Sequence, residues 1–136
     1  MMKFKMVKIN IDQFAILSQD APNGDIDVNV NLRFKYSLEA RRIASVMQFS
    51  FKHKESPLLI LEVTCEFEIH PDDWNELFTS SELCISKSIL EYFGVQTVGT
   101  ARGIMHCKTE GTAYNGIILP PLDITQLVKE DIHIPL

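Results

Sequence analysis

The sequence lacks any long hydrophobic run. No stretch of its 136 residues approaches the roughly 20 consecutive apolar residues that a membrane-spanning helix needs. The first residues, MMKFKMVKINIDQ, are partly basic but have no continuous apolar core, so we expect neither a signal peptide nor a membrane span. Cysteine is also scarce. Cys65, Cys84 and Cys107 are odd in number and have no CxxC spacing, which indicates buried free thiols in a reducing cytoplasm.

An excess of positive charge is missing as well. Lys and Arg total 13 against 18 Asp and Glu, which gives a net charge of −5 and a pI of about 5.3. A nucleic-acid backbone is bound through a basic stripe, so we expect no nucleic-acid partner. The content of 46% hydrophobic and 23% charged residues is ordinary for a globular protein. The length predicts a single domain over residues 1–136.

Motifs for catalysis, metal binding and phosphate binding are absent too. There is no GxSxG, no phosphate-binding glycine loop and no paired-carboxylate motif. The four histidines are scattered along the chain: His53, His70, His106 and His133. His106 and Cys107 are adjacent on a predicted helix, where neighbouring side chains point about 100° apart, so they do not form a nucleophile–base pair. We therefore predict that the protein is not an enzyme and has no catalytic residue, metal or cofactor.

The first half of the chain is patterned as strands. Every second residue from Ile26 to Leu38 is apolar, which predicts a half-buried strand. Three further segments are predicted as strands: Lys3–Leu17, whose two phases of alternation indicate a bulge, Ile43–Phe51 and Leu58–Ile69. Because their connections are short, we predict a four-stranded antiparallel meander over about residues 3–69, with one face in water.

The second half is patterned as helices. Thr79-Ser80-Ser81-Glu82 matches a capping box, which predicts a helix to about Phe93 that Gly94 ends. A second helix is predicted from about Thr97 to Glu110, and a short third one after Asp123. The predicted fold class is thus α+β, with two or three helices between about residues 80 and 130 on one face of the sheet.

These helices offer little cover for so many apolar strand residues. Ile26, Val30 and Phe34 are expected to pack under them, yet the predicted helix Leu83–Phe93 is apolar around much of its own circumference. Gly99-x-x-x-Gly103 indicates a close approach of another backbone. Three interpretations stay open: a filled monomer core, helices sandwiched between subunits, or apolar surface left for a ligand or peptide. We favour the oligomer among them.

The order of elements resembles the SecB family of protein-export chaperones. The most specific similarity is ARGIMHCKTEGTAYNGIILPPLDITQLV, Ala101–Val128, and its matching residues are Ala101-Arg102, Gly111-Thr112 and Leu119-Pro120-Pro121-Leu122. Asp20–Asn23 (DAPN) and Leu61-Glu62-Val63 resemble shorter segments of the family. The resemblance implies a long helix after four antiparallel strands, an extended proline-bearing segment, a last helix, and a cytoplasmic homotetramer that is a dimer of dimers.

The same resemblance implies a function. SecB-like proteins are ATP-independent chaperones (holdases) that bind unfolded or partly folded polypeptides in apolar grooves, in the service of protein export. The candidate groove residues here are Phe49, Phe51, Phe67, Tyr92, Tyr114, Ile117, Ile118, Leu119 and Leu122. Asp20 and Glu62 match two acidic positions with which the export chaperone contacts the translocase ATPase. Their alternative interpretation is that of ordinary solvated acids.

Departures from the family pattern keep two other functions open. Val98-Gly99-Thr100 stands where the family has an aromatic residue, Pro and Tyr, and Ala113 stands where it has a groove aromatic. The first alternative is a dedicated SecB-like chaperone or adaptor of one partner, such as an antitoxin. The second is a small-ligand-binding protein or an enzyme, which would need a pocket that joins His70, Asp72 and Cys107.

Overall fold

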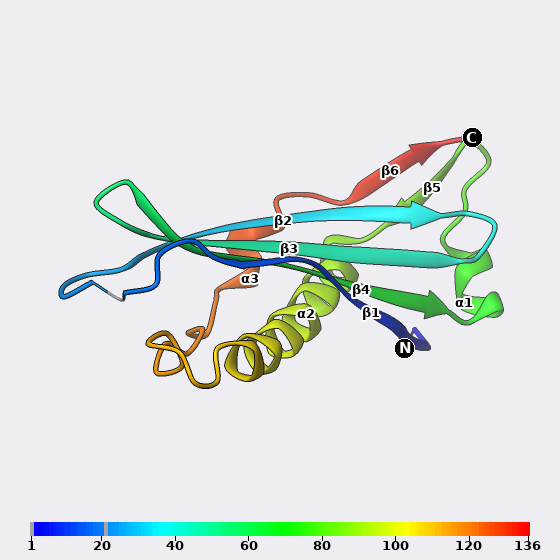
Figure 1. Cartoon of the computed structure of the whole chain (residues 1–136). Coiled ribbons are helices and arrows are strands. Elements are labelled where there is room, and N and C mark those ends of the chain that lie inside the picture. The colour runs from blue at the N-terminus through cyan, green and yellow to red at the C-terminus, as the bar shows by residue number, and fades with distance from the viewer. Residues whose placement is uncertain (1, 21) are drawn as a thin grey trace.

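A computed structural model describes residues 2–20 and 22–136, so Met1 and Ala21, which belongs to the DAPN segment, lie outside the described residues. The fold is α+β, as the sequence predicts (Figure 1). A four-stranded antiparallel sheet is formed by β1 (Phe4–Ile16), β2 (Asp27–Ser37), β3 (Arg42–His53) and β4 (Ser56–Ile69). These strands match the four predicted ones closely, because alternation of apolar and polar residues is a local signal.

The strand order corrects the predicted meander. Only β2, β3 and β4 follow one another across the sheet, and β1 pairs with β4 in the order β1-β4-β3-β2. A complete meander would leave β4 at an edge, although its helix-facing side chains are at most 1% exposed: Leu59, Leu61, Val63, Cys65, Phe67 and Ile69. Pairing on both sides satisfies the backbone groups of this buried strand.

The bulge predicted in the first strand is confirmed. The pairing of β1 with β4 shifts register between Met6 and Lys8 and again between Ile11 and Gln13. Each shift returns apolar side chains to the helix-facing side, since a slip of one residue reverses the faces of a strand. Both phases of the alternation in this segment therefore serve the same side of the sheet.

One long helix replaces the two that the sequence predicts. α2 (Lys87–Lys108) begins after Ser86, whose Oγ accepts the N–H of Ile89 at 3.4 Å. The helix continues through Gly94, where an added Cβ would lie 2.8 Å from Cγ2 of Ile124. Gly94 is therefore small because another segment packs against it, and the prediction that it ends a helix is wrong.

The predicted capping box begins a strand instead of a helix. Oγ1 of Thr79 accepts the N–H groups of Ser81 and Glu82, at 3.4 and 3.1 Å, as a cap would. The chain then continues as β5 (Glu82–Ile85), which pairs with β6 (Ile132–Pro135) in a two-stranded antiparallel ribbon. A turn satisfies these two N–H groups as well as a helix does, so the signal is ambiguous.

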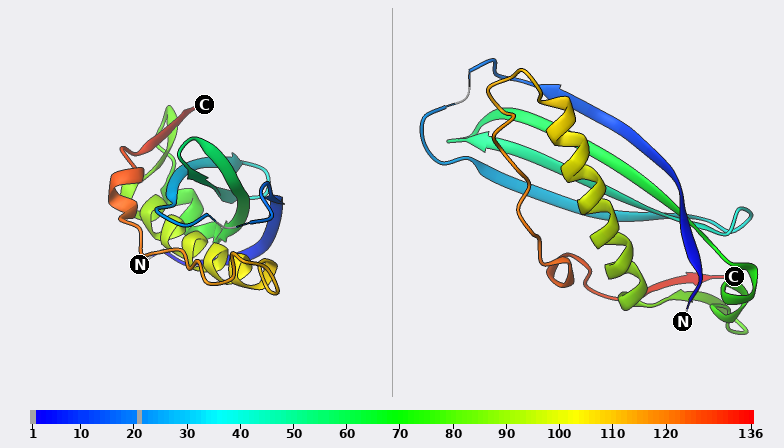
Figure 2. Two further views of the ribbon diagram at one scale, coloured as in Figure 1. Left: turned by 60° about the vertical axis from the view of Figure 1, so that its left-hand side comes forward. Right: turned by 90° about the horizontal axis from the view of Figure 1, so that it is seen from below.

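Two short helices complete the fold. α1 (Pro71–Glu76) follows β4 and was not predicted, whereas α3 (Ile124–Leu127) begins at Asp123 as predicted, with Oδ1 of Asp123 accepting the N–H of Thr125 at 3.1 Å. Seen from below, α2 crosses the sheet and the segment that leads to α3 runs beside it (Figure 2). Within residues 2–20 and 22–136, none of the helices combines the length and hydropathy needed to cross a membrane.

Candidate functional site

Five of the predicted groove residues belong to the hydrophobic core. The side chains of Phe49, Phe51, Phe67, Tyr114 and Leu119 are at most 2% exposed. The ring of Phe67 stacks on that of Phe93 with centroids 4.3 Å apart, and the Tyr114 hydroxyl donates to the backbone oxygen of Ser18 at 2.7 Å. These side chains hold the helix layer against the sheet and present no surface to a client, so their assignment to a groove is corrected.

The other four predicted groove residues keep exposed surface but lie in two places. Tyr92, on α2, is 49% exposed and contacts the Phe4 ring edge-to-face at 5.2 Å. Ile117, Ile118 and Leu122 belong to the extended segment between α2 and α3, where Ile118 is 55% exposed. Figure 2 shows this segment on the β2 side of α2, opposite the side on which β1 lies. The structure therefore does not bring Tyr92 together with Ile118.

Arg102 fixes the extended segment against α2. Its Nε donates to the backbone oxygen of Leu119 at 2.8 Å, and its Nη2 donates to that of Pro120 at 3.2 Å. Bonds from a charged donor are stronger than neutral ones. The segment is therefore held as a cover over the β2 half of the helix-facing side.

An open apolar trough lies on the other side of α2, along β1. Ile9 and Ile11 pair with Cys65 and Val63, so they face the helix layer, yet they are 52% and 40% exposed. At Gly99 on α2 an added Cβ would meet nothing within 4 Å. We call this surface the β1–α2 trough and define it by Met2, Phe4, Ile9, Ile11, Ile89, Tyr92, Gly99, Gly103 and Ile104.

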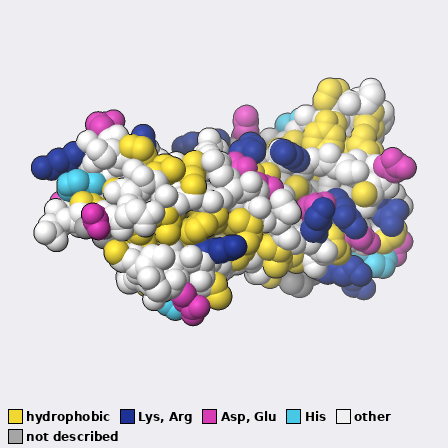
Figure 3. Space-filling model, viewed as in Figure 1, with side chains coloured by type: hydrophobic (Ala, Val, Ile, Leu, Met, Phe, Trp, Pro, Cys, Tyr) yellow, Lys and Arg dark blue, Asp and Glu magenta, His cyan; other side chains and the backbone are white. Residues whose placement is uncertain are grey.

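The trough has two shallow hollows and cationic ends. One hollow, of about 560 Å³, lies beside Phe4 and Tyr92 and includes Lys3. The other, of about 460 Å³, lies beside Ile11 and Gly103 and includes Lys108. Between Glu91 and Arg102 the sequence of α2 has no charged residue, and this run is the signal that could have located the trough. Figure 3 shows hydrophobic side chains along the middle of this face.

The opposite face of the sheet is polar, and ion pairs link several of its charged side chains. Glu62, a candidate translocase contact, accepts a hydrogen bond from Arg33 at 3.2 Å and keeps only 16% of its side chain exposed. Asp20, the other candidate, is exposed in the loop after β1, where its backbone oxygen lies 3.3 Å from the Tyr114 hydroxyl. The two acids lie on different elements, and a translocase contact at either one remains a prediction.

The enzyme hypothesis requires one pocket that contains His70, Asp72 and Cys107, but these residues do not lie together. Nδ1 of His70 accepts the N–H of Asp72 at 3.2 Å at the start of α1. Cys107 lies at the far end of α2, beside Ile11, whereas the backbone N–H of His70 bonds to the opposite end of β1, at Lys3. The structure therefore forms no common pocket from these three side chains.

The three cysteines differ in burial. All are free, but only Cys65 is buried, while Cys84 is half-buried and Cys107 is exposed. Burial raises the pKa of the Cys65 thiol, and hydrogen bonds with Thr97 and Thr100 partly oppose this shift. Cys65 is therefore a neutral thiol of the core, and the prediction of buried thiols is wrong for the other two.

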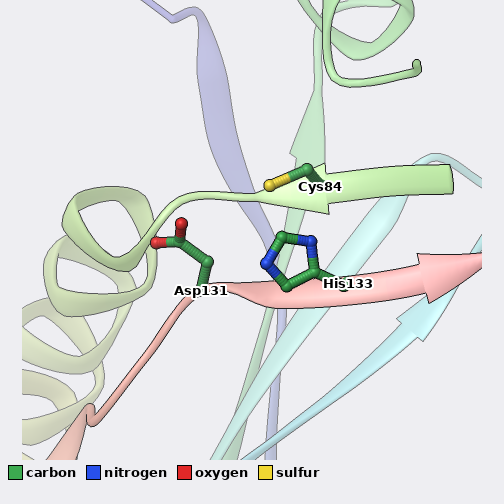
Figure 4. A group of neighbouring side chains, drawn as sticks. All are labelled: Cys84, Asp131 and His133. Carbon is green, nitrogen blue, oxygen red and sulfur yellow. The ribbon is translucent and has the colours of Figure 1, made fainter.

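One group of potential metal ligands is brought together by the fold. Cys84 on β5 lies close to Asp131 and His133 at the start of β6 (Figure 4). Sequence spacing did not reveal this group, because only the pairing of the two strands brings distant residues together. The sequence shows only that Asp131 and His133 lie two residues apart, a spacing that places both on one side of a strand.

Comparisons with known proteins do not indicate a function for this chain. No protein-family model matches the chain, and the search of curated proteins finds no match either. Among solved structures, a crystal structure of a protein of unknown function from Streptococcus agalactiae matches 89% of this chain and 99% of that chain, with a TM-score of 0.43 and 13% sequence identity.

Proposed function

We propose that the protein is a SecB-like, ATP-independent holdase that binds unfolded or partly folded polypeptides in the β1–α2 trough. The observation that carries the proposal is the exposure of Ile9 and Ile11 on the helix-facing side of the sheet. Full burial of an exposed side chain of this size contributes about 1.5–3 kcal/mol, so covering the exposed half of each isoleucine contributes roughly half of that. An extended apolar segment of a client would cover both residues together.

The position of β1 supports the binding of an extended chain. β1 is an edge strand of the sheet, so one row of its backbone N–H and C=O groups has no partner strand within the sheet. A client strand added there would gain main-chain hydrogen bonds that are independent of its sequence, while its side chains would reach the trough. Such binding suits a chaperone of many clients.

The proposed assembly is a homotetramer that forms as a dimer of dimers. The outer side of α2 supports association, because the apolar side chain of Val95 is 56% exposed there. Part of the trough then becomes an interface, and the remainder serves clients. Binding to unfolded chains would keep them from aggregating by mass action.

The proposal is tested by suppression of aggregation. Two unrelated enzymes, unfolded in guanidinium chloride, are diluted into buffer with a stoichiometric amount of the full chain, and light scattering is followed. Ile9→Asp places a charge in the trough and is expected to weaken client binding about tenfold or more, since 1.4 kcal/mol corresponds to a factor of ten. Ile118→Asp is the matched control, because Ile118 is equally exposed on the other side of α2.

The outcomes separate the interpretations. We expect Ile118→Asp to protect as well as the natural chain and Ile9→Asp to fail, both with unchanged circular dichroism. Protection by neither the natural chain nor the variants would contradict a general holdase and leave a dedicated chaperone of one partner. If Ile9→Asp lowers the mass measured by light scattering without loss of protection, the trough is an interface between copies instead of the client site.

A further inference from the structure

The β5–β6 ribbon has two different faces. Leu83, Ile85 and Ile134 point inward and are at most 6% exposed, so this face belongs to the core. The register pairs Cys84 with His133, and directly paired residues lie on the same side of a ribbon. Both therefore lie on its outer face, away from the core.

Asp131 completes a compact group on this face. It lies two residues before His133, and residues two apart along a strand point to the same side. The sulfur of Cys84, a carboxylate oxygen of Asp131 and a ring nitrogen of His133 all lie within 4.8 Å of one another. Figure 4 shows the three side chains converging from the two chain segments.

Two hydrogen bonds hold the group in place. Nδ1 of His133 lies 2.9 Å from Oε1 of Glu82, on the neighbouring strand. When Nδ1 carries the proton of the neutral ring, Nε2 keeps a lone pair, and a carboxylate in this position is a common outer partner of metal-binding histidines. Oδ1 of Asp131 accepts the N–H of Lys87 at 2.6 Å, so the first turn of α2 orients this carboxylate.

We propose that Cys84, Asp131 and His133 form a binding site for a divalent transition-metal ion, with Zn²⁺ as the best match. A thiolate, an imidazole and a carboxylate are the ligand types that Zn²⁺ takes, whereas Mg²⁺ and Ca²⁺ require oxygen ligands alone. Three protein ligands leave the fourth tetrahedral position to water or to another group.

The local charge is consistent with a cation. The carboxylates of Asp131 and Glu82 both lie beside His133. On binding, the metal–sulfur bond replaces the S–H bond and the proton passes to solvent. The bound ion would offset the negative charge of the two carboxylates. It would also join β5 to the start of β6, whose Asp131 is hydrogen-bonded to the first turn of α2.

The test uses Co²⁺ as a spectroscopic substitute for Zn²⁺ on the full chain. We expect one Co²⁺ per chain, with a thiolate-to-cobalt charge-transfer band in the near ultraviolet that Zn²⁺ displaces. Cys84→Ser is expected to abolish the band, because it removes the sulfur ligand with little change in size. Glu82→Gln keeps all three ligands and is expected to lower the affinity about 10-fold to 100-fold, the usual effect of losing an outer carboxylate.

Matched controls come from the sequence-adjacent pair His106 and Cys107. Both are exposed on α2, so Cys107→Ser and His106→Gln are expected to leave the band and the affinity unchanged. Zn²⁺ is also expected to raise the melting temperature of the natural chain and of Cys107→Ser, but not that of Cys84→Ser. The absence of a band in the natural chain, or a band that survives Cys84→Ser, would overturn the proposal.

Discussion

The two edges of the sheet carry similar apolar patterns but are covered differently. On β2, Val28, Val30, Leu32 and Phe34 are half-buried against the core, whereas Ile9 and Ile11 on β1 remain 40–52% exposed. α2 packs over the central strands β3 and β4, so each edge depends on what lies beside the helix. Pattern alone therefore identifies the side of the sheet that faces the helices, and the covering layer decides which part of that side stays open.

The β2 edge is covered by the C-terminal part of the chain. Side chains of Leu32 and Ile124 both lie close to Gly94, so the edge strand, α3 and α2 meet there. The β1 edge is covered only at its two ends, where the Phe4 ring contacts those of Tyr92 and Phe93 and where Phe14 and Ile16 are half-buried against the core. Substitutions along α2 can therefore disturb the covered parts and the open part separately.

The largest expected effect comes from removing the anchor at the start of β1. Phe93 is fully buried, lies 4.9 Å from Phe4 and stacks on Phe67. Phe93→Ala is expected to lower the free energy of unfolding by about 3–5 kcal/mol, through lost burial and the cavity left behind. Guanidinium chloride denaturation measures this change. Tyr92→Ala, at the exposed neighbouring position, is the control, and an equal loss in the two variants would contradict the anchoring role of Phe93.

A smaller effect is expected on the β2 side. In Gly94→Ala the new Cβ would lie 2.8 Å from Cγ2 of Ile124, so α3 or α2 must move. We expect a loss of about 1–3 kcal/mol from overpacking, although alanine favours a helix more than glycine by up to about 1 kcal/mol. Equilibrium denaturation measures the loss. In a double-mutant cycle with Ile124→Ala the two losses should be less than additive, and full additivity would exclude the clash as the cause.

The sequence predicted what depends on neighbouring residues along the chain. It located the four long strands, the bulge in β1 and the cap at Asp123. It did not predict the pairing of β1 with β4, because that choice depends on which strand must be covered on both sides. The start of α2 was misplaced because Thr79 makes cap-like hydrogen bonds in a turn.

The candidate site was harder to predict, because exposure and side-chain proximity depend on residues that are distant in the sequence. Phe49 and Phe67 were predicted to line a groove, since exposure cannot be read from residue type, and both are buried. Ile9 and Ile11 were not singled out, because their exposure results from the position of α2. The cluster around Cys84 depends on the β5–β6 register, which joins Glu82 to His133 across 51 residues of sequence.

The smallest expected effect has the opposite sign and tests the openness of the trough. Gly99→Ala is the same substitution in the same helix as Gly94→Ala, but the added Cβ would meet nothing within 4 Å. Its gain in helix propensity should therefore raise the free energy of unfolding, by up to about 1 kcal/mol. Denaturation curves at low and high protein concentration measure this gain. A loss that grows with concentration would contradict an open surface at Gly99, because it would mean that a second copy packs closely against this turn of α2.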